Sequence, residues 1–232
     1  MKKLFKVLIF LLLVGISIAL LFIGNGYNMY KEAIETMPLE EKVEKIRAKE
    51  NYAEFSELPQ MYVNAVISVE DKRFFKHNGI DFIAIGRAAI NDIKAMSYVE
   101  GGSTITQQLA KNMYFTQEKI MERKIAEVFM AWKIEDNYSK EDIFELYVNS
   151  IYFGDGYYTV KEACRGYFNK ELDEMTDYEC ILLAGIPNAP SVYAPTKNPD
   201  LAKQRQRQVM NKMIENGYLT EDEANEILKQ AE

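Results

Sequence analysis

The sequence predicts a mainly α-helical protein, in which a globular helical body follows one membrane-spanning helix. Three observations predict this class: a long apolar run near the N-terminus, helical windows with capping patterns through the rest of the chain, and no run of alternating strands. The 232 residues are 48% hydrophobic and 27% charged, a balance that excludes both a disordered chain and a uniformly membrane-embedded one.

The apolar run covers residues 4–23 and is interrupted only by Lys6, Gly15 and Ser17. Twenty helical residues span roughly 30 Å, the thickness of one hydrocarbon layer. The alternative is a cleaved signal peptide, but that would have a shorter apolar core and an A-x-A cleavage pattern, which does not follow here. We therefore expect residues 1–26 to form a short cytoplasmic tip and an uncleaved transmembrane signal anchor.

The flanking charges predict the orientation of this anchor. Lys2, Lys3 and Lys6 precede or enter the span, so the N-terminus is expected to stay in the cytoplasm and the remainder to lie outside the cytoplasmic membrane. That remainder carries 25 basic and 35 acidic residues, a net charge of −10. Any contact with anionic lipid is therefore expected from local patches and not from bulk charge.

Residues 27–57 are polar and rich in Lys and Glu, and they predict a membrane-proximal stalk or the start of a small lobe; a mere linker is the alternative. A helix is expected from Pro59, with a core-facing stripe at Tyr62, Ala65, Val66 and Val69. Capping-box patterns predict three later helix starts, at Ser139-x-x-Asp142, Thr176-x-x-Glu179 and Thr220-x-x-Glu223. Residues 58–232 are therefore assigned to one helical domain.

The composition also excludes several classes of function. His77 is the only histidine, and two cysteines cannot make a four-Cys zinc site or a disulfide scaffold. Glycine patterns for nucleotide cofactors are absent, and the net charge of −7 argues against a nucleic-acid partner. No organic cofactor is expected. Cys164 and Cys180 could form a disulfide outside the cell, but their apolar helical settings favour two buried free thiols.

The first segment with chemical potential is EDKRFFKHNG, from Glu70 to Gly79. Two adjacent carboxylates at a helix end, followed by aromatic residues, can hold one glutamate in a partly desolvated cleft, where its pKa suits general-base work. Taken alone, Glu-Asp-Lys-Arg is more simply a solvated helix end. His77 is expected to be a structural hydrogen-bonding residue, and Asp71 an orienting or capping group.

The second segment is GGSTITQQLAKNMYF, from Gly101 to Phe115. Two glycines predict a turn, and Ser103 can cap the helix that follows. Hydroxyls, amides and backbone N–H groups then gather at a helix N-terminus, which suits an anion such as phosphate. The alternative is a cap with no further role.

The third segment is RKIAEVFMAWKIED, from Arg123 to Asp136. Arg123, Lys124 and Glu127 share one helix face. The simplest interpretation of these residues alone is a surface ion pair. The alternative is a charged cluster that binds pyrophosphate, with Glu127 holding the lysine or a divalent cation.

Two further segments complete the pattern. In the fourth, Glu145, Asn149 and Tyr152 are candidates for a buried polar support network beside a glycine-containing loop. In the fifth, from Leu182 to Pro195, three prolines predict a rigid extended loop after an apolar helix end.

Together these five segments resemble the peptidoglycan glycosyltransferases, glycosyltransferase family 51. The motif EDxxFxxHxG is met by Glu70, Asp71, Phe74, His77 and Gly79, and RKxxE by Arg123, Lys124 and Glu127. GxSTITQQ is met by Gly101 or Gly102 and the six residues from Ser103 to Gln108, continuing to Lys111 and Asn112. The fourth motif departs from the common Tyr-Gly-Ile, with Tyr158-Thr159-Val160 in its place.

The resemblance implies a lysozyme-like helical lobe, a smaller membrane-proximal lobe and a cleft between them. It implies an enzyme that polymerises lipid II into linear glycan by inverting β-1,4 transfer, with release of undecaprenyl pyrophosphate. Glu70 would be the general base, and Glu127 would organise the cationic cluster or a Mg²⁺ or Mn²⁺ ion. The implied substrate-binding residues are Asp71, Phe74, His77, Gly102, Ser103, Thr104, Thr106, Gln107, Gln108, Lys111, Asn112, Lys119, Arg123 and Lys124.

The implied partners are lipid II, the growing lipid-linked glycan chain, the bacterial cytoplasmic membrane and other cell-wall synthesis enzymes. No Ser-x-x-Lys or Lys-Thr-Gly occurs, which predicts a monofunctional polymerase without transpeptidase activity. Two alternatives stay open: a lysozyme-like glycan hydrolase or lytic transglycosylase, which would have no use for a pyrophosphate cluster, and a non-enzymatic wall-synthesis scaffold, which would not need Glu70.

Overall fold

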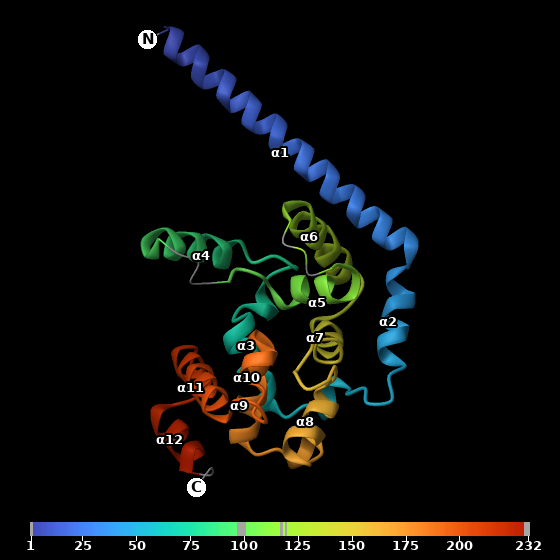
Figure 1. Ribbon diagram of the computed structural model, residues 1–232, viewed down its shortest axis with the longest axis vertical. Helices are drawn as coiled ribbons and strands as arrows, with labels where there is room; N and C mark the ends of the chain where they lie inside the picture. Colours follow the sequence, from blue (N-terminus) through green and yellow to red (C-terminus); the bar gives the residue numbers. More distant parts are fainter. Residues whose placement is uncertain (1, 97–100, 117, 119, 230–232) are drawn as a thin grey trace.

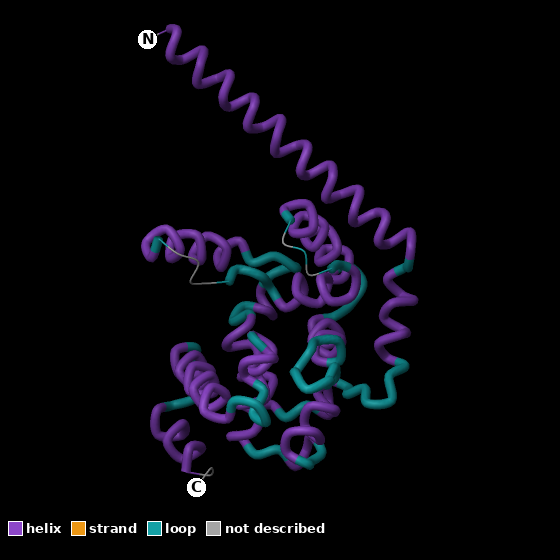
Figure 2. The backbone as a smooth tube through the Cα atoms, in the orientation of Figure 1, coloured by secondary structure: helices purple, strands orange, loops and turns teal. Residues whose placement is uncertain are grey.

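The computed structural model describes residues 2–96, 101–116, 118 and 120–229, and these are almost entirely helical (Figures 1 and 2). The α-helices in these ranges are α1 (Lys2–Thr36), α2 (Leu39–Arg47), α3 (Gln60–Glu70), α4 (Phe82–Ala95), α5 (Ile105–Tyr114), α6 (Met121–Glu135), α7 (Lys140–Val148), α8 (Val160–Phe168), α9 (Asp177–Gly185), α10 (Pro190–Tyr193), α11 (Pro199–Glu215) and α12 (Glu221–Lys229). Short 3₁₀ helices lie at Phe55–Glu57 (η1), Phe74–Lys76 (η2), Leu172–Glu174 (η3) and Ile186–Asn188 (η4). Within the described ranges no strand forms, and the predicted helical class is confirmed.

The N-terminal helix α1 contains the predicted apolar span and is long and apolar enough to cross a membrane. It continues without a break to Thr36, ten residues past the expected end of the anchor, and extends away from the body in Figure 1. The next helix, α2, turns back along the body and buries Leu39, Val43 and Ile46 in its core. The linker alternative for residues 27–57 is therefore wrong over α2, because one face of this segment is packed.

The body is organised around α3, which packs against α9 and α11. The predicted stripe is confirmed, since Tyr62, Ala65 and Val66 are buried and Val69 is partly buried against the same core. Pro59 is the N-cap residue, so the helix begins one residue later than expected, at Gln60. Helix α5 packs between α6 and α7 and connects this core to the N-terminal side of the molecule.

The three predicted capping boxes are confirmed at Ser139, Thr176 and Thr220. The extended loop predicted after α9 is wrong: Pro187 and Pro190 stand in the first turns of η4 and α10. A proline fits a first helical turn because its missing N–H has no helical partner there, so prolines can start short helices as well as end long ones.

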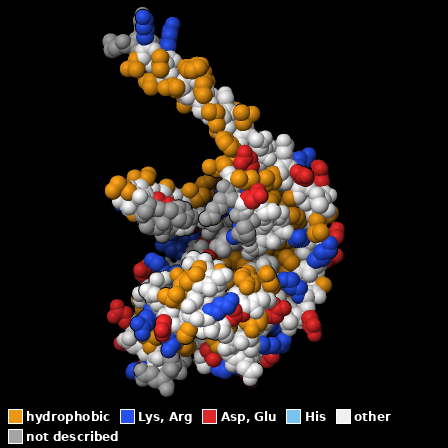
Figure 3. All heavy atoms as spheres, in the orientation of Figure 1, with side chains coloured by type: hydrophobic (Ala, Val, Ile, Leu, Met, Phe, Trp, Pro, Cys, Tyr) orange, Lys and Arg blue, Asp and Glu red, His pale blue; other side chains and the backbone are white. Residues whose placement is uncertain are grey.

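The helices form a larger body and a smaller part that lies towards α1. Helix α4 projects from the body on the same side as α1, whereas α11 and α12 lie at the opposite end with the C-terminus (Figure 1). Figure 3 shows a hollow below α4, bordered by basic and acidic side chains. This arrangement agrees with a small and a large lobe; the likeness of the larger lobe to lysozyme stays a prediction.

Cys164 and Cys180 are buried free thiols, as their apolar helical settings predicted. Burial raises the pKa of each thiol to about 12. Both are therefore held in the unreactive protonated form.

Candidate active site

Two adjoining cavities lie where α3, α4, α5, α6 and α11 meet. The larger, of about 810 Å³, contains Glu70 on its wall, and the smaller, of about 450 Å³, is lined by Arg123, Lys124 and Glu127. Ser103, Gln108 and Lys111 line both cavities, so the two form a continuous cleft across the start of α5.

Glu70 is the last residue of α3 and is partly exposed to the larger cavity. Its Oε2 accepts a hydrogen bond from Gln108 Nε2 at 2.7 Å. Burial raises the pKa of this carboxyl group, whereas the Gln108 hydrogen bond and the positive charges of Arg205 and Lys111 oppose the rise. The net effect is an upward shift, which makes Glu70 a stronger base than an exposed glutamate.

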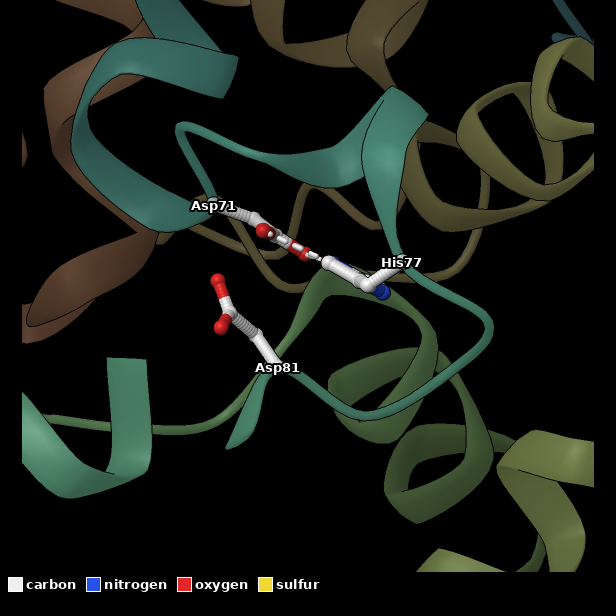
Figure 4. Close-up of side chains that lie close together, drawn as sticks. All are labelled: Asp71, His77 and Asp81. Carbon is white, nitrogen blue, oxygen red and sulfur yellow. Dashed lines mark hydrogen bonds and ion pairs between the residues drawn. The ribbon is translucent and has the colours of Figure 1, made fainter. Parts of the chain in front are cut away.

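The neighbouring Asp71 is buried and connects two motifs. Its carboxylate pairs with His77 Nε2 at 2.9 Å (Figure 4). The same carboxylate accepts a hydrogen bond from the backbone N–H of Ile105, the first residue of α5, at 3.1 Å. Asp71 is thus an orienting and capping group, as predicted, and His77 is its hydrogen-bonding partner. The solvated-end interpretation of Glu70–Arg73 is wrong for Asp71, whose carboxylate is 3% exposed.

Phe74 follows in η2 and is fully buried, next to Phe144 and beneath the Lys140 ammonium group. It lines neither cavity, and neither does His77. The structure therefore gives both residues the task of holding the loop after Glu70, whereas direct contact with a substrate stays a prediction.

Asp81 lies beside Asp71 and His77, and the three side chains converge closely enough to suggest a cation site (Figure 4). Both carboxylates and His77 Nε2 are already engaged, however, whereas the buried His77 Nδ1 has no hydrogen-bond partner among the described residues. Asp81 pairs with Arg73 and accepts the Ala84 N–H at the start of α4, and the Arg73 hydrogen bond holds the pKa of Asp81 at about 2. This group is better described as a hydrogen-bonded network that fixes the loop between α3 and α4.

The start of α5 is fixed by Thr104 and Gln107, which form a reciprocal capping box. Thr104 Oγ1 also donates to the carbonyl oxygen of Gly79 at 2.6 Å. The expectation that Ser103 caps this helix is wrong, because its hydroxyl oxygen instead accepts a hydrogen bond from Lys124 Nζ at 2.7 Å. Thr106 is buried and donates to Glu135, so it supports the helix from behind the cavity.

The first two turns of α6 carry the predicted charged cluster. Glu127 is 1% exposed. One of its carboxylate oxygens accepts a hydrogen bond from the Arg123 guanidinium group, and the other accepts a hydrogen bond from Lys124 Nζ at 2.8 Å. The surface-pair interpretation is therefore wrong. Because both oxygens already accept hydrogen bonds from cations, the donor set does not fit the Mg²⁺ or Mn²⁺ ion expected at Glu127.

Lys111 completes the cluster from α5. Burial lowers the pKa of Lys111, an effect strengthened by Arg123 and Lys124 and opposed by Glu127. Three cationic side chains thus face one buried carboxylate, and the excess positive charge makes the smaller cavity suited to an anion.

Three other predicted residues have different positions. Gly102 lines the larger cavity, and Asn112 is exposed and lies outside both cavities. Lys119 lies outside the described residues.

The predicted support network is present for two of its three members. Glu145 accepts hydrogen bonds from Tyr52 and from the Phe55 N–H, and Asn149 exchanges hydrogen bonds with the Ala53 backbone. Tyr152 is 37% exposed and instead packs against Tyr158, with the two rings tilted by 37°.

The sequence motifs did not include the residues that α4 and α11 add to the larger cavity. Arg205 and Lys212 line it from α11, together with Arg87 and Asn91 from α4. No motif marks them, since they lie in ordinary amphipathic helices. Their signal is only the polar face of each helix, which does not tell a cavity from open solvent.

Comparisons with known proteins identify the family of this chain. A family model described as Transglycosylase matches residues 36–214. Penicillin-binding protein 1F of Bacillus subtilis (strain 168) is 47% identical over 169 residues, which cover 73% of this chain and 24% of that protein. Penicillin-binding protein 1A of Aquifex aeolicus (strain VF5) is 45% identical over 178 residues, covering 77% of this chain and 24% of that one.

Among solved structures, the crystal structure of penicillin-binding protein 1A from Haemophilus influenzae aligns with a TM-score of 0.37 and 26% identity, covering 54% of this chain and 16% of that chain. The chain thus spans about a quarter of the length of the curated relatives it matches.

Proposed function

This chain belongs to the transglycosylase family, and on that premise we propose that it polymerises lipid II into linear peptidoglycan glycan strands. The reaction is an inverting β-1,4 glycosyl transfer that releases undecaprenyl pyrophosphate, and these 232 residues carry no transpeptidase signature. Lipid II and the growing lipid-linked chain are the substrates.

One observation carries the proposal: a carboxylate with a raised pKa and an excess of cations occupy adjoining cavities of one cleft. A transfer from a lipid pyrophosphate requires both, a base for the attacking hydroxyl and positive charge for the departing phosphate.

In the proposed step, Glu70 accepts the proton of the 4-hydroxyl group of the acceptor lipid II. The hydroxyl oxygen forms a bond to the anomeric carbon of the growing chain, and the bond from that carbon to the pyrophosphate oxygen breaks. Attack from the opposite face inverts α to β. Lys111, Arg123 and Lys124 stabilise the negative charge that develops on the leaving group. Glu127 holds the two α6 cations in place through its two oxygens.

We place the protein in the bacterial cytoplasmic membrane as a single-pass protein, with its N-terminus inside and its catalytic body on the outer face. The apolar span of α1 and the lysines before it support this arrangement. Substrates that carry lipid tails would then reach the cleft from the same leaflet.

Helix α4 supports a second contact with the membrane. Its exposed apolar side chains are those of Phe82, Ile83, Ile85, Ile90 and Ile93, followed by Met96 just beyond its end. Figure 3 shows apolar side chains gathered at the projecting end of this helix, on the side of the molecule where α1 lies. Apolar exposure on this scale favours a non-aqueous neighbour, here the outer leaflet.

The direct test is glycan polymerisation from lipid II by the purified full-length protein and by Glu70→Gln. The parent is expected to give polymer, and a folded Glu70→Gln variant is expected to lose about 100-fold or more of the rate. Circular dichroism provides the folding control for the variant.

The alternatives make different predictions in the same assay. Shortening of preformed glycan with lipid II left intact would favour a hydrolase or lytic transglycosylase. Inactivity of the parent in both assays, with Glu70→Gln still supporting wall synthesis in cells, would favour the scaffold.

A further inference from the structure

The end of the apolar helix α1 is in close contact with α6. Among the residues of α1 whose burial the structure describes, Gly26 alone is buried. Around it Tyr27 and Tyr30 pack on Phe129, with ring centroids 5.2 and 5.9 Å apart. Phe129 in turn packs on Trp132 at 5.8 Å, so an aromatic cluster fixes the crossing point of the two helices.

The contact at Gly26 is too close for any other residue type. A Cβ atom there would lie 2.6 Å from the Cβ and Cγ2 atoms of Ile125 and 2.9 Å from the carbonyl oxygen of Glu122. Two of these three atoms belong to the branch point of a stiff side chain and to the backbone, so rotation of a side chain cannot relieve the overlap. Any larger residue at position 26 must separate the helices.

The contacted turns of α6 are the ones that carry the cationic cluster. Glu122 and Ile125 lie in the same two turns of the helix as Arg123, Lys124 and Glu127. Lys124 also spans the cleft to Ser103, at the start of α5, with an Nζ–Oγ distance of 2.7 Å. The start of α6 is thus held by α1 on one side and reaches the cleft on the other. A displacement caused at Gly26 would be transmitted to the groups that face the substrate.

We propose that Gly26 is a positioning residue of the active site: its missing side chain lets the membrane helix dock directly on α6 and thereby sets the position of Arg123 and Lys124 in the cleft. The inference rests on the proposed function, which gives these cations their task. The membrane helix then acts as a structural part of the catalytic machinery as well as an anchor.

The experiment compares Gly26→Leu with Gly24→Leu in the full-length protein reconstituted in lipid vesicles. Gly24 is the matched control because it lies two residues away on the same helix and a Cβ atom there meets nothing within 4 Å. Because misplacement by about 1 Å can cost about 100-fold in rate, Gly26→Leu is expected to lower kcat/KM for lipid II by about 10- to 100-fold. Gly24→Leu is expected to stay within about twofold, as exposed substitutions usually do.

A double-mutant cycle separates positioning from a general loss of stability. If Gly26 acts through the cluster, Gly26→Leu should cost less than about threefold in a Lys124→Ala background, because residues that act as a unit are not additive. Where Gly26→Leu does not fold, Gly26→Ala adds one carbon at the same contact and is expected to show the same loss to a smaller degree.

Three results would overturn the inference. The first is Gly26→Leu with the parent's kcat/KM, and the second is a loss that multiplies fully with Lys124→Ala. The third is a parent that makes no polymer, which would remove the proposed function and this inference with it; the first two remove the inference alone.

Discussion

The environment of Glu70 favours the action of this residue as a base and lowers the stability of the folded protein. Burial raises its pKa, and the negative charge of Asp71 contributes to the rise, whereas Gln108, Arg205 and Lys111 favour the ionised form. The net effect is a raised pKa, so ionising this carboxylate at neutral pH costs more free energy in the folded protein than in the unfolded chain. Retention of such a group is expected where a base is needed.

We predict that Glu70→Gln raises the thermal stability of the protein at pH 7. A folded-state pKa above the unfolded value destabilises the fold once the pH exceeds the unfolded pKa, and a neutral amide removes that cost. The gain should therefore shrink as the pH falls to about 4, where the glutamate of the unfolded chain is protonated as well. Thermal unfolding in detergent at both pH values measures it, with Glu50→Gln, at an exposed position, as the control. A variant less stable than the parent at pH 7 contradicts this account.

Gln108 is expected to control the protonation of Glu70. Its amide donates to the carboxylate, and its Oε1 accepts the buried hydroxyl of Tyr147 at 3.5 Å, which orients the amide. Gln108→Met removes the donor with little change in volume, so the pKa of Glu70 should rise further. The acid limb of the kcat/KM profile for lipid II should then move to higher pH. A lower plateau with an unmoved limb would mean that Gln108 serves only to bind substrate.

At the scale of the helix, caps were predictable where they involve only local residues. Ser139, Thr176 and Thr220 begin their helices as their patterns require. At α5 the neighbouring Ser103 and Thr104 both qualify, and a tertiary contact decides between them, because Lys124 of α6 engages the serine. No local pattern contains that information.

The candidate site divides in the same way. Its motif-bearing groups were predictable because the motifs of the resembled family follow one another in a fixed order along the sequence. The wall supplied by Arg205 and Lys212 was not, since it depends on α11 packing beside α3 across more than 130 residues of sequence. Burial likewise decided the meaning of Glu127, whose spacing alone fits a surface pair equally well.

Helix α4 allows a direct test of membrane contact. A spin label at Ile93→Cys is expected to be accessible to oxygen and shielded from a water-soluble nickel reagent in lipid vesicles, because this side chain is 76% exposed on the apolar face. Glu226→Cys on α12, at the opposite end of the molecule, should show the reverse. Cys164 and Cys180 should not compete for the label, since both are buried and their thiols have a pKa of about 12. Equal nickel access at both sites contradicts the proposed contact.

The whole molecule is acidic, with a net charge of −7, yet its cleft is lined by cations. Attraction of the proposed pyrophosphate substrate therefore depends on the local field of Lys111, Arg123 and Lys124 against a repulsive background. Salt screens partly exposed charges over about 8–10 Å at moderate ionic strength.

We predict that the KM for lipid II rises several-fold between about 50 and 300 mM salt while kcat changes less. Salt screens the long-range attraction that brings the substrate to the cleft more strongly than it screens the short contacts in the bound complex. Initial rates at fixed detergent or lipid composition measure this. Sodium chloride and potassium glutamate, compared at equal ionic strength, control for specific anion binding. A KM that is independent of salt would contradict a cationic recognition site.

The unbroken course of α1 has a consequence for how the protein meets its substrate. A helix of 35 residues is roughly 50 Å long, longer than the hydrocarbon layer it is proposed to cross by about 20 Å, and it joins the body without a flexible tether. The cleft is therefore held at one height above the lipid surface. For the lipid-linked substrates proposed above, the search is then two-dimensional, and encounter depends on lateral diffusion and on the number of substrates per unit area of membrane.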